Sequence, residues 1–274
     1  MNTLHLVSKT DVIEGAVRAL AVLEAFSAER QRLNATQVAE RAGITRAAAR
    51  RHLLTLHALG YLEGEGGVYW LGVRVLRLAG NYLASARLPR VVQPTLNRLS
   101  AALDCAVSVA VLDEADVVIV ARSGEQRMLR QALPFGTNLG ARLPAFATST
   151  GRILLAQLDR TALSEWLSDK TLPRLTPHTT TGKVAWRACV QRAGAQGYCV
   201  ASQEHELGVQ ALAVPLRDGA GRVVAALNVV VAAAQDQALA ADGKVLDGPT
   251  EAFKLVQKYL RSMLAAADEV RLLL

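Results

Sequence analysis

The stretch NATQVAERAGITRAAARRHLLTLHALG, residues 34 to 60, decides the fold of the first part of the chain. Asn34 stands where a helix would begin, and Gln37 follows three residues later, which is the spacing of a capping box. Gly43 would end this helix, because glycine adopts the left-handed backbone of a helix C-terminus without steric cost. Thr45 is then placed to cap a second helix. The stretch therefore predicts two short helices joined by a tight turn.

The second helix is predicted to have an apolar side and a basic side. The apolar residues that repeat at helical spacing, and so would face a core, are Ala49, Leu53, Leu56 and Leu59. Arg46, Arg50 and Arg51 lie off that stripe, and no acidic residue occurs between Arg41 and His52. This is the layout of a helix-turn-helix, whose second helix enters the major groove of DNA. The alternative is an ordinary helical hairpin with a solvated basic face.

The flanking residues favour the DNA-binding interpretation. The sequence EGEGG, residues 63 to 67, is a hairpin turn signal, and VYWL, residues 68 to 71, would be the returning strand of a wing. Upstream, residues 13 to 26 read as a helix. Its apolar face, predicted to pack on the helix-turn-helix, comprises Ala16, Val17, Leu20 and Leu23.

Length and composition indicate a globular protein of two domains. The chain has 274 residues, against roughly 100–200 residues per domain. Its residues are 51% hydrophobic and 20% charged, its apolar runs fall short of a membrane span, and no secretory leader opens it. A cytoplasmic location without membrane contact is therefore expected. Cys105, Cys189 and Cys199 lack C-x-x-C spacing, so they are expected to be buried packing residues rather than a disulfide framework, a zinc site or redox sensors.

The positive charge is concentrated near the start of the chain. The formal net charge is +7, and residues 1 to 90 hold 12 Lys or Arg against 7 Asp or Glu, a net +5. The remaining 184 residues carry only +2. A basic excess confined to the smaller part is the electrostatic footprint that nucleic-acid binding requires.

An amphipathic segment and two prolines indicate where the chain divides into domains. Residues 73 to 83 read as an amphipathic helix, a candidate linker that also pairs with a partner chain, and Pro89 and Pro94 bracket the boundary to a second domain. The expected domains are a winged helix-turn-helix at 1–71, a linker helix at 72–89 and a second domain at 90–274.

The second domain is predicted to be α+β, with helices and an antiparallel sheet. The strand candidates are 105–112, 116–122, 127–133, 198–202, 209–216 and 222–231. The helix candidates are 92–103, 148–158, 162–168, 183–195 and 249–270. The last of these places Phe253, Val256, Leu260 and Met263 on one face.

Three features of this domain suggest a site for a small carboxylate. Ser149 and Thr150 at a predicted helix start offer hydroxyls and free backbone N–H groups, and Asn228 is a polar residue in an otherwise apolar strand, which needs a partner if buried. Arg142 lies just upstream, within reach of an acid. Each has a structural alternative: a helix cap for the hydroxyls, an edge position for the asparagine, and a surface salt bridge for the arginine.

The chain resembles the IclR family of bacterial transcription regulators over residues 12 to 265. Besides the winged helix-turn-helix, the resemblance rests on four segments: GARLPAFATSTGRILLA (140–156), AQGY (195–198), EHELG (204–208) and AVPLRDGAGRVVAALNV (213–229). Within the family it is similar to the branch that controls degradation of aromatic acids such as protocatechuate and 4-hydroxybenzoate. The resemblance implies a winged helix-turn-helix, a GAF-like effector domain, and a homodimer or tetramer that binds a double-stranded DNA operator, with RNA polymerase a candidate further partner.

The resemblance also implies site residues. The DNA-reading helix would be residues 45 to 59. Base or phosphate contacts are expected from Thr45, Arg46 and Arg50, and contacts to the DNA backbone from Arg51 and His52, with Ala47 also in the DNA-binding set. The effector pocket would be lined by Ser149, Thr150, Ala201, Ala211, Asn228 and Val230, and the position of Arg142 in the sequence adds it to this set. In glyoxylate-type members an acidic residue stands at the place of Ala201, a cysteine at that of Ala211, and serines at those of Asn228 and Val230. The pocket here is thus less polar, which suits a ring-bearing acid.

No catalytic residues, cofactor or metal are expected. Glu204, His205 and His178 could suggest acid–base chemistry, but the sequence has no G-x-S-x-G elbow, HExxH or phosphate-binding glycine loop. Two other classes remain open at this point. One is an enzyme whose basic N-terminus binds RNA or assembles subunits, and the other is a regulator that responds to a protein partner rather than to a small ligand.

Overall fold

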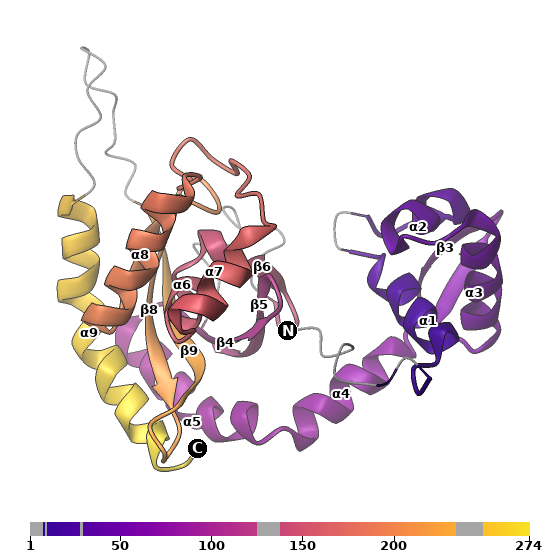
Figure 1. The fold of residues 1–274 in the computed structure, drawn as a ribbon. Helices are drawn as coiled ribbons and strands as arrows, with labels where there is room; N and C mark the ends of the chain where they lie inside the picture. The colour runs from indigo at the N-terminus through magenta and orange to yellow at the C-terminus, as the bar shows by residue number, and fades with distance from the viewer. Residues whose placement is uncertain (1–7, 9, 28–29, 125–137, 234–248) are drawn as a thin grey trace. The chain divides into compact units, whose positions relative to one another are not determined.

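The computed structural model describes residues 8, 10–27, 30–124, 138–233 and 249–274, with the side chains of the last helix described from Lys254 onward (Figure 1). The chain divides into two compact units, residues 1–85 and 86–274. Within the described residues, no helix combines the length and apolarity needed to cross a bilayer. The strand expected at 127–133 lies outside the described residues.

The first unit is a winged helix-turn-helix. It contains α1 (Glu14–Glu24), α2 (Ala35–Ala42) and α3 (Arg46–Ala58), followed by the wing strands β2 (Leu62–Glu65) and β3 (Val68–Leu71). A two-residue strand, β1 (Leu33–Asn34), pairs with β3 and completes a sheet of order β1-β3-β2. The sequence did not predict β1, because two residues carry no periodicity.

The predicted caps of the helix-turn-helix are confirmed. The Asn34 side chain accepts hydrogen bonds from the Thr36 and Gln37 backbone N–H groups at 3.0 Å, and the Asn34 N–H donates to the Gln37 side chain at 2.9 Å. Gly43 adopts φ of 64°, and the Thr45 hydroxyl accepts from the Ala48 N–H at 3.2 Å. Local hydrogen bonding therefore fixes both ends of the turn.

The core of the first unit differs in part from the expected apolar faces. Ala49, Leu53 and Leu56 are buried as predicted, whereas Leu59 is 49% exposed, because α3 ends at Ala58 and Leu59 is its C-cap. In α1 the expected face is wrong in part: Leu20 is 58% exposed, whereas Leu23 packs against the core as predicted. The residues of this segment that enter the core are Val22, Ala25 and Phe26.

The segment between the DNA-binding fold and the sheet domain forms two helices. In α4 (Val75–Ser85), which belongs to the first unit, no residue is buried. In the second unit, α5 (Arg87–Leu103) contains both Pro89 and Pro94. Pro89 lies in the first turn, where helical N–H groups have no partner in any case, and Pro94 forgoes one helical hydrogen bond. The prolines therefore lie inside a helix, and the units divide between Ser85 and Ala86.

The second unit is built on a six-stranded antiparallel sheet of order β6-β5-β4-β9-β8-β7. The strands are β4 (Ala106–Asp113), β5 (Asp116–Ser123), β6 (Arg142–Pro144), β7 (Cys199–Ser202), β8 (Val209–Arg217) and β9 (Val223–Ala232). Five of them match strand candidates from the sequence. The sixth, β6, was not among the strand candidates.

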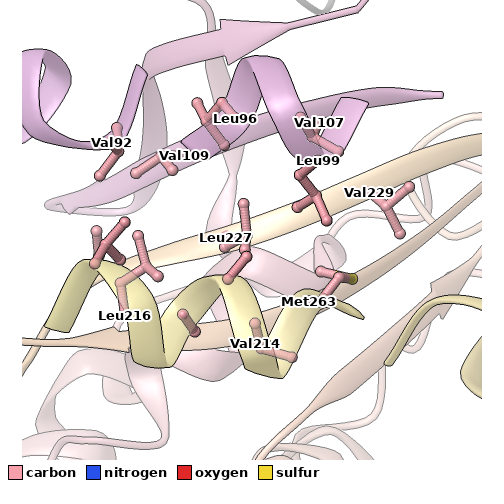
Figure 2. Packing of buried hydrophobic residues seen from close by; sticks show 14 of the residues in the cluster. Val92, Leu96, Leu99, Val107, Val109, Val214, Leu216, Leu227, Val229 and Met263 are labelled. Atoms are coloured by element: carbon pink, nitrogen blue, oxygen red, sulfur yellow. The ribbon is translucent and has the colours of Figure 1, made fainter. Parts of the chain in front are cut away.

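Helices cover both faces of this sheet. On one face α5 and α9 (Pro249–Arg271) pack on alternate strand residues such as Leu216, Leu227 and Val229 (Figure 2). In α9, Met263 is fully buried, and Leu260 is packed against this core as expected. On the other face lie α6 (Ser149–Leu155), α7 (Arg160–Ser168) and α8 (Lys183–Gln196), with a short 3-10 turn, η2 (Ala145–Ala147), before α6. The α+β architecture is confirmed.

Candidate functional site

The first unit presents the expected DNA-reading helix to solvent. Thr45, Arg46, Ala47, Arg50 and Arg51 are all exposed, and His52 is half-buried. Within the part of the chain that the structure describes, none of these three arginines forms an ion pair. The basic side of α3 is thus open for phosphate or base contacts, as a recognition helix requires.

The second unit contains a cavity between the start of α6 and one face of the sheet. It encloses about 530 Å³ of space that no atom occupies, its open mouth included. Its lining residues are Leu143, Ala147, Thr148, Ser149, Thr150, Ala201, Glu204, His205, Glu206, Val209, Ala211, Asn228 and Val230.

Small side chains on three strands make the floor of the cavity. Val230 of β9 faces Ala211 of β8, which faces Ala201 of β7 in the register of the sheet. Because strand residues alternate between faces, these residues and Asn228 lie on the face that carries α6, opposite the α5 and α9 layer. Two alanines in this row leave the space that larger side chains would fill.

Hydrogen-bond donors gather at the start of α6. The Thr148 hydroxyl caps the helix by accepting from the Gly151 N–H at 3.2 Å. In the described part of the chain no hydrogen bond is found for the backbone N–H groups of Ser149 and Thr150, which line the cavity with their hydroxyls. Asn228, buried in β9, accepts a hydrogen bond from the Ser108 hydroxyl through its Oδ1 atom. The side-chain amide N–H groups of Asn228 therefore remain available to donate hydrogen bonds to a ligand.

The loop between β7 and β8 carries an acidic rim. Glu204 accepts two hydrogen bonds from the guanidinium of Arg152 in α6, with Nη2 and Oε2 2.6 Å apart, and a third from the Thr180 N–H at 3.0 Å. Burial lowers the pKa of Arg152, but the bonds to Glu204 outweigh it and raise that pKa above its ordinary value. Glu204 is therefore held as part of a buried, neutral ion pair.

The next two residues of the rim are not paired in this way. Burial lowers the pKa of His205, which favours the neutral imidazole. Its Nδ1 atom is buried without a hydrogen-bond partner in the described structure. Burial also raises the pKa of Glu206, and no ion pair to it is found among the described residues.

Six of the seven expected effector residues line the cavity: Ser149, Thr150, Ala201, Ala211, Asn228 and Val230. Arg142 is the exception. It stands in the edge strand β6, where its Nη1 atom donates to Asp113 at 2.6 Å and its Nε atom to Asp116 at 3.1 Å. Its guanidinium is engaged in a surface salt bridge, the alternative that the sequence left open.

The structure adds residues that sequence reasoning placed outside the site. Glu204 and His205 were considered only for acid–base chemistry, and Leu143, Glu206 and Val209 were not considered, yet all five line the cavity. Tertiary contacts without a local sequence signal bring Leu143 of β6, Val209 of β8 and the β7–β8 loop to the cavity beside α6. Within the described residues, no group of three His, Cys, Asp or Glu side chains is placed to hold a metal ion.

Two family models match the chain. The model described as the IclR helix-turn-helix domain matches residues 15–66, and the model described as bacterial transcriptional regulator IclR C-terminal matches residues 80–239. The second match alone covers more than half of the chain.

Curated relatives and solved structures agree with these matches. The chain is 50% identical to the p-hydroxybenzoate hydroxylase transcriptional activator of Acinetobacter baylyi over 220 residues, 80% of this chain and 81% of the relative. It is 46% identical to the Pca operon regulatory protein of the same organism over 225 residues, 82% of this chain and 81% of the relative. The inducer-binding domain of an Acinetobacter PobR double mutant, solved with 3-hydroxybenzoic acid, is 37% identical with a TM-score of 0.58 and covers 68% of this chain and 98% of its own. The chain therefore belongs to the IclR family of bacterial transcription regulators.

Proposed function

We propose that this regulator binds an operator through α3 and binds a hydroxylated aromatic carboxylic acid in the cavity beneath α6. It would control a catabolic operon in response to that acid. The observation that carries the proposal is the composition of the cavity, with hydrogen-bond donors at one end and a floor of small apolar side chains. The relatives regulate transcription and are not enzymes, and this chain is likewise not an enzyme.

The donors at the start of α6 suit a carboxylate. A carboxylate has only acceptor oxygens, and Ser149, Thr150 and Asn228 together offer backbone N–H, hydroxyl and amide donors. The floor formed by Ala201, Ala211 and Val230 suits the flat face of a ring rather than a short polar chain. The names of the relatives, which concern p-hydroxybenzoate and 3-hydroxybenzoic acid, support the same class of ligand.

On the DNA side, Thr45, Arg46, Ala47, Arg50, Arg51 and His52 are proposed to contact the operator. Arginine holds a guanine edge or a phosphate with two parallel hydrogen bonds, so the exposed guanidinium groups of α3 serve either task. Two recognition helices in a dimer would read repeated or palindromic half-sites. Such a regulator would act in the cytoplasm, with RNA polymerase a candidate partner.

A second copy of the chain is the proposed partner of α4. This helix buries none of its residues, and its exposed apolar side chains include Leu76, Leu78 and Tyr82. Exposed apolar side chains of this kind are costly to leave in water. A homodimer, or a tetramer built from dimers, would cover them and place two copies of α3 on one operator.

The proposed response is a population shift. An acid that binds one arrangement of the oligomer better than another changes the fraction of molecules able to bind DNA, by as much as its differential affinity allows. The N–H groups of Ser149 and Thr150 start a helix that packs on the sheet, so filling the cavity stabilises this part of the second unit directly.

Thermal unfolding with and without 4-hydroxybenzoate tests the cavity. The wild-type protein is expected to be stabilised, and a Ser149→Ala, Asn228→Ala double variant is expected to lose that stabilisation. Arg142→Gln is the matched control, because Arg142 lies outside the lining, and it should keep the full shift. An unchanged shift in the double variant would refute the proposed lining. No stabilisation of the wild type by any aromatic acid would instead favour a regulator that responds to a protein partner.

A further inference from the structure

The cavity has a second polar end that recognition of a carboxylate does not use. The loop at residues 203–208 joins β7 to β8, and its backbone closes with a hydrogen bond from the Gln203 N–H to the Val209 carbonyl at 2.7 Å. From this loop Glu204, His205 and Glu206 line the cavity. They lie at one end of the strands that form the floor.

The register of the sheet separates this loop from the donor end. On β8, Ala213 pairs with Asn228, Ala211 with Val230, and Val209 with Ala232, which are three successive rows on the same face. Residues two apart in a strand are about 6.6 Å apart, so the loop beyond Val209 and the Asn228 row are separated by about 13 Å of backbone. The loop and Asn228 therefore lie at opposite ends of the strands that form the floor.

The two ends differ in charge and in hydrogen-bonding character. No lysine or arginine is among the described residues that line the cavity. Arg152 neutralises Glu204, which leaves the Glu206 carboxylate as the uncompensated negative group at the loop end. A carboxylate offers only acceptors, and neutral His205 offers one acceptor and one donor nitrogen.

We propose, on the basis of the proposed function, that Glu206 and His205 determine which ligand the cavity binds. They accept a hydrogen bond from a hydroxyl group on the aromatic ring of the ligand, at the position opposite its carboxylate. The same end of the cavity excludes a second carboxylate. A phenolic hydroxyl keeps its proton near neutral pH, as tyrosine does, and so donates to Glu206. A second carboxylate at this place would be repelled by the Glu206 carboxylate. The cavity thus selects para-hydroxy monocarboxylates over ring dicarboxylates.

Calorimetric titration at pH 8 tests this selection with benzoate, 4-hydroxybenzoate and benzene-1,4-dicarboxylate. Wild-type protein should bind 4-hydroxybenzoate at least about tenfold more tightly than benzoate, the factor expected for one hydrogen bond to a charged group. The dicarboxylate should show no measurable binding. Glu206→Gln should reduce the hydroxyl preference about fivefold, because the bond then goes to a neutral acceptor, and should admit the dicarboxylate.

Two further variants separate the role of the loop from general effects. His205→Gln should weaken binding of 4-hydroxybenzoate but leave benzoate unchanged, and Glu165→Gln, an exposed position on α7, should alter neither. Equal binding of benzoate and 4-hydroxybenzoate by the wild type, or a hydroxyl preference that Glu206→Gln does not reduce, would overturn the inference while leaving the aromatic-acid cavity standing. If none of the three acids binds, the proposed function fails and the inference with it.

Discussion

Arg152 of α6 and Glu204 of the β7–β8 loop form a two-point ion pair inside the second unit, with side chains only 3% and 10% exposed. The same guanidinium donates through Nε to the Phe146 carbonyl at 3.2 Å, and the Trp186 indole donates to that carbonyl at 2.8 Å. Thr176 and Thr179 donate to backbone carbonyls at positions 203 and 204. One buried network therefore joins the helix at the donor end of the cavity to the loop at its acceptor end.

Arg152→Met is expected to reduce the free energy of unfolding by about 3–5 kcal/mol, because it leaves the Glu204 carboxylate buried without its partner. Chemical denaturation measures the change. Arg142→Met is the matched control, since its ion pairs with Asp113 and Asp116 are half exposed and should contribute no more than about 1 kcal/mol. If both variants were destabilised by the same small amount, the network would have no special structural role.

Gly151→Ala is expected to destabilise the second unit severely. A Cβ atom at this position of α6 would overlap the backbone of Ala145, which cannot move without displacing the buried η2 turn. Gly219→Ala, in the turn before β9 where a Cβ atom meets nothing within 4 Å, should leave the melting temperature nearly unchanged. Circular-dichroism melts compare the two variants, and a Gly151→Ala protein as stable as its control would show that α6 does not approach η2 this closely.

Replacing Arg46 and Arg50 by alanine should weaken operator binding and flatten its dependence on salt. A phosphate that no arginine neutralises keeps its condensed counterions when the protein binds. The slope of log K against log salt should therefore become shallower by about 1 for each replaced arginine that touches phosphate. An arginine that reads a base would instead relax sequence preference. Arg261→Ala, an exposed arginine of α9, serves as the control and should change neither quantity. Unchanged affinity and slope in the Arg46 and Arg50 variant would contradict the assignment of α3.

The thiols of Cys105 and Cys199 are expected to react slowly with disulfide reagents in the folded protein. Burial raises the pKa of Cys105 to about 11 and that of Cys199 to about 12, so both remain protonated at pH 8, and only the thiolate attacks. Reaction with a chromogenic disulfide should be fast for all three cysteines only after unfolding in guanidinium. Rapid modification of Cys105 or Cys199 in the native protein would restore the possibility of redox sensing.

Much of the fold could be predicted because its signals are local. The Asn34 capping box, the turn at Gly43 and the alternation along β8 and β9 each appear within a few residues of sequence. The predictions that were wrong depend on tertiary contacts. Leu20 and Val22 are equally apolar, and only the packing of α1 on its neighbours decides that Val22 is buried. Likewise, β6 is a strand because it pairs with β5, and its three residues are too few to show the alternation that predicts a strand.

For the site, too, some residues could be predicted from the sequence and others depend on tertiary contacts. Family resemblance identified the floor and the helix start, from Ser149 to Val230, and the structure brings those residues to one cavity. It could not place Arg142, because a basic residue near a pocket in sequence can equally meet surface acids such as Asp113. It also did not reveal the acidic loop end, because the role of Glu204 depends on Arg152, 52 residues earlier in the chain.

The central claim, that a small aromatic acid in this cavity controls DNA binding, is tested most directly by fluorescence anisotropy with DNA from upstream of the protein's own gene. Saturating 4-hydroxybenzoate should change the operator Kd of the full-length protein by at least about fivefold, the lower end of usual allosteric couplings. Ala211→Leu, which fills the cavity floor, should bind the same DNA but no longer respond to the acid. An operator Kd that is identical with and without the acid in the wild type would contradict the account.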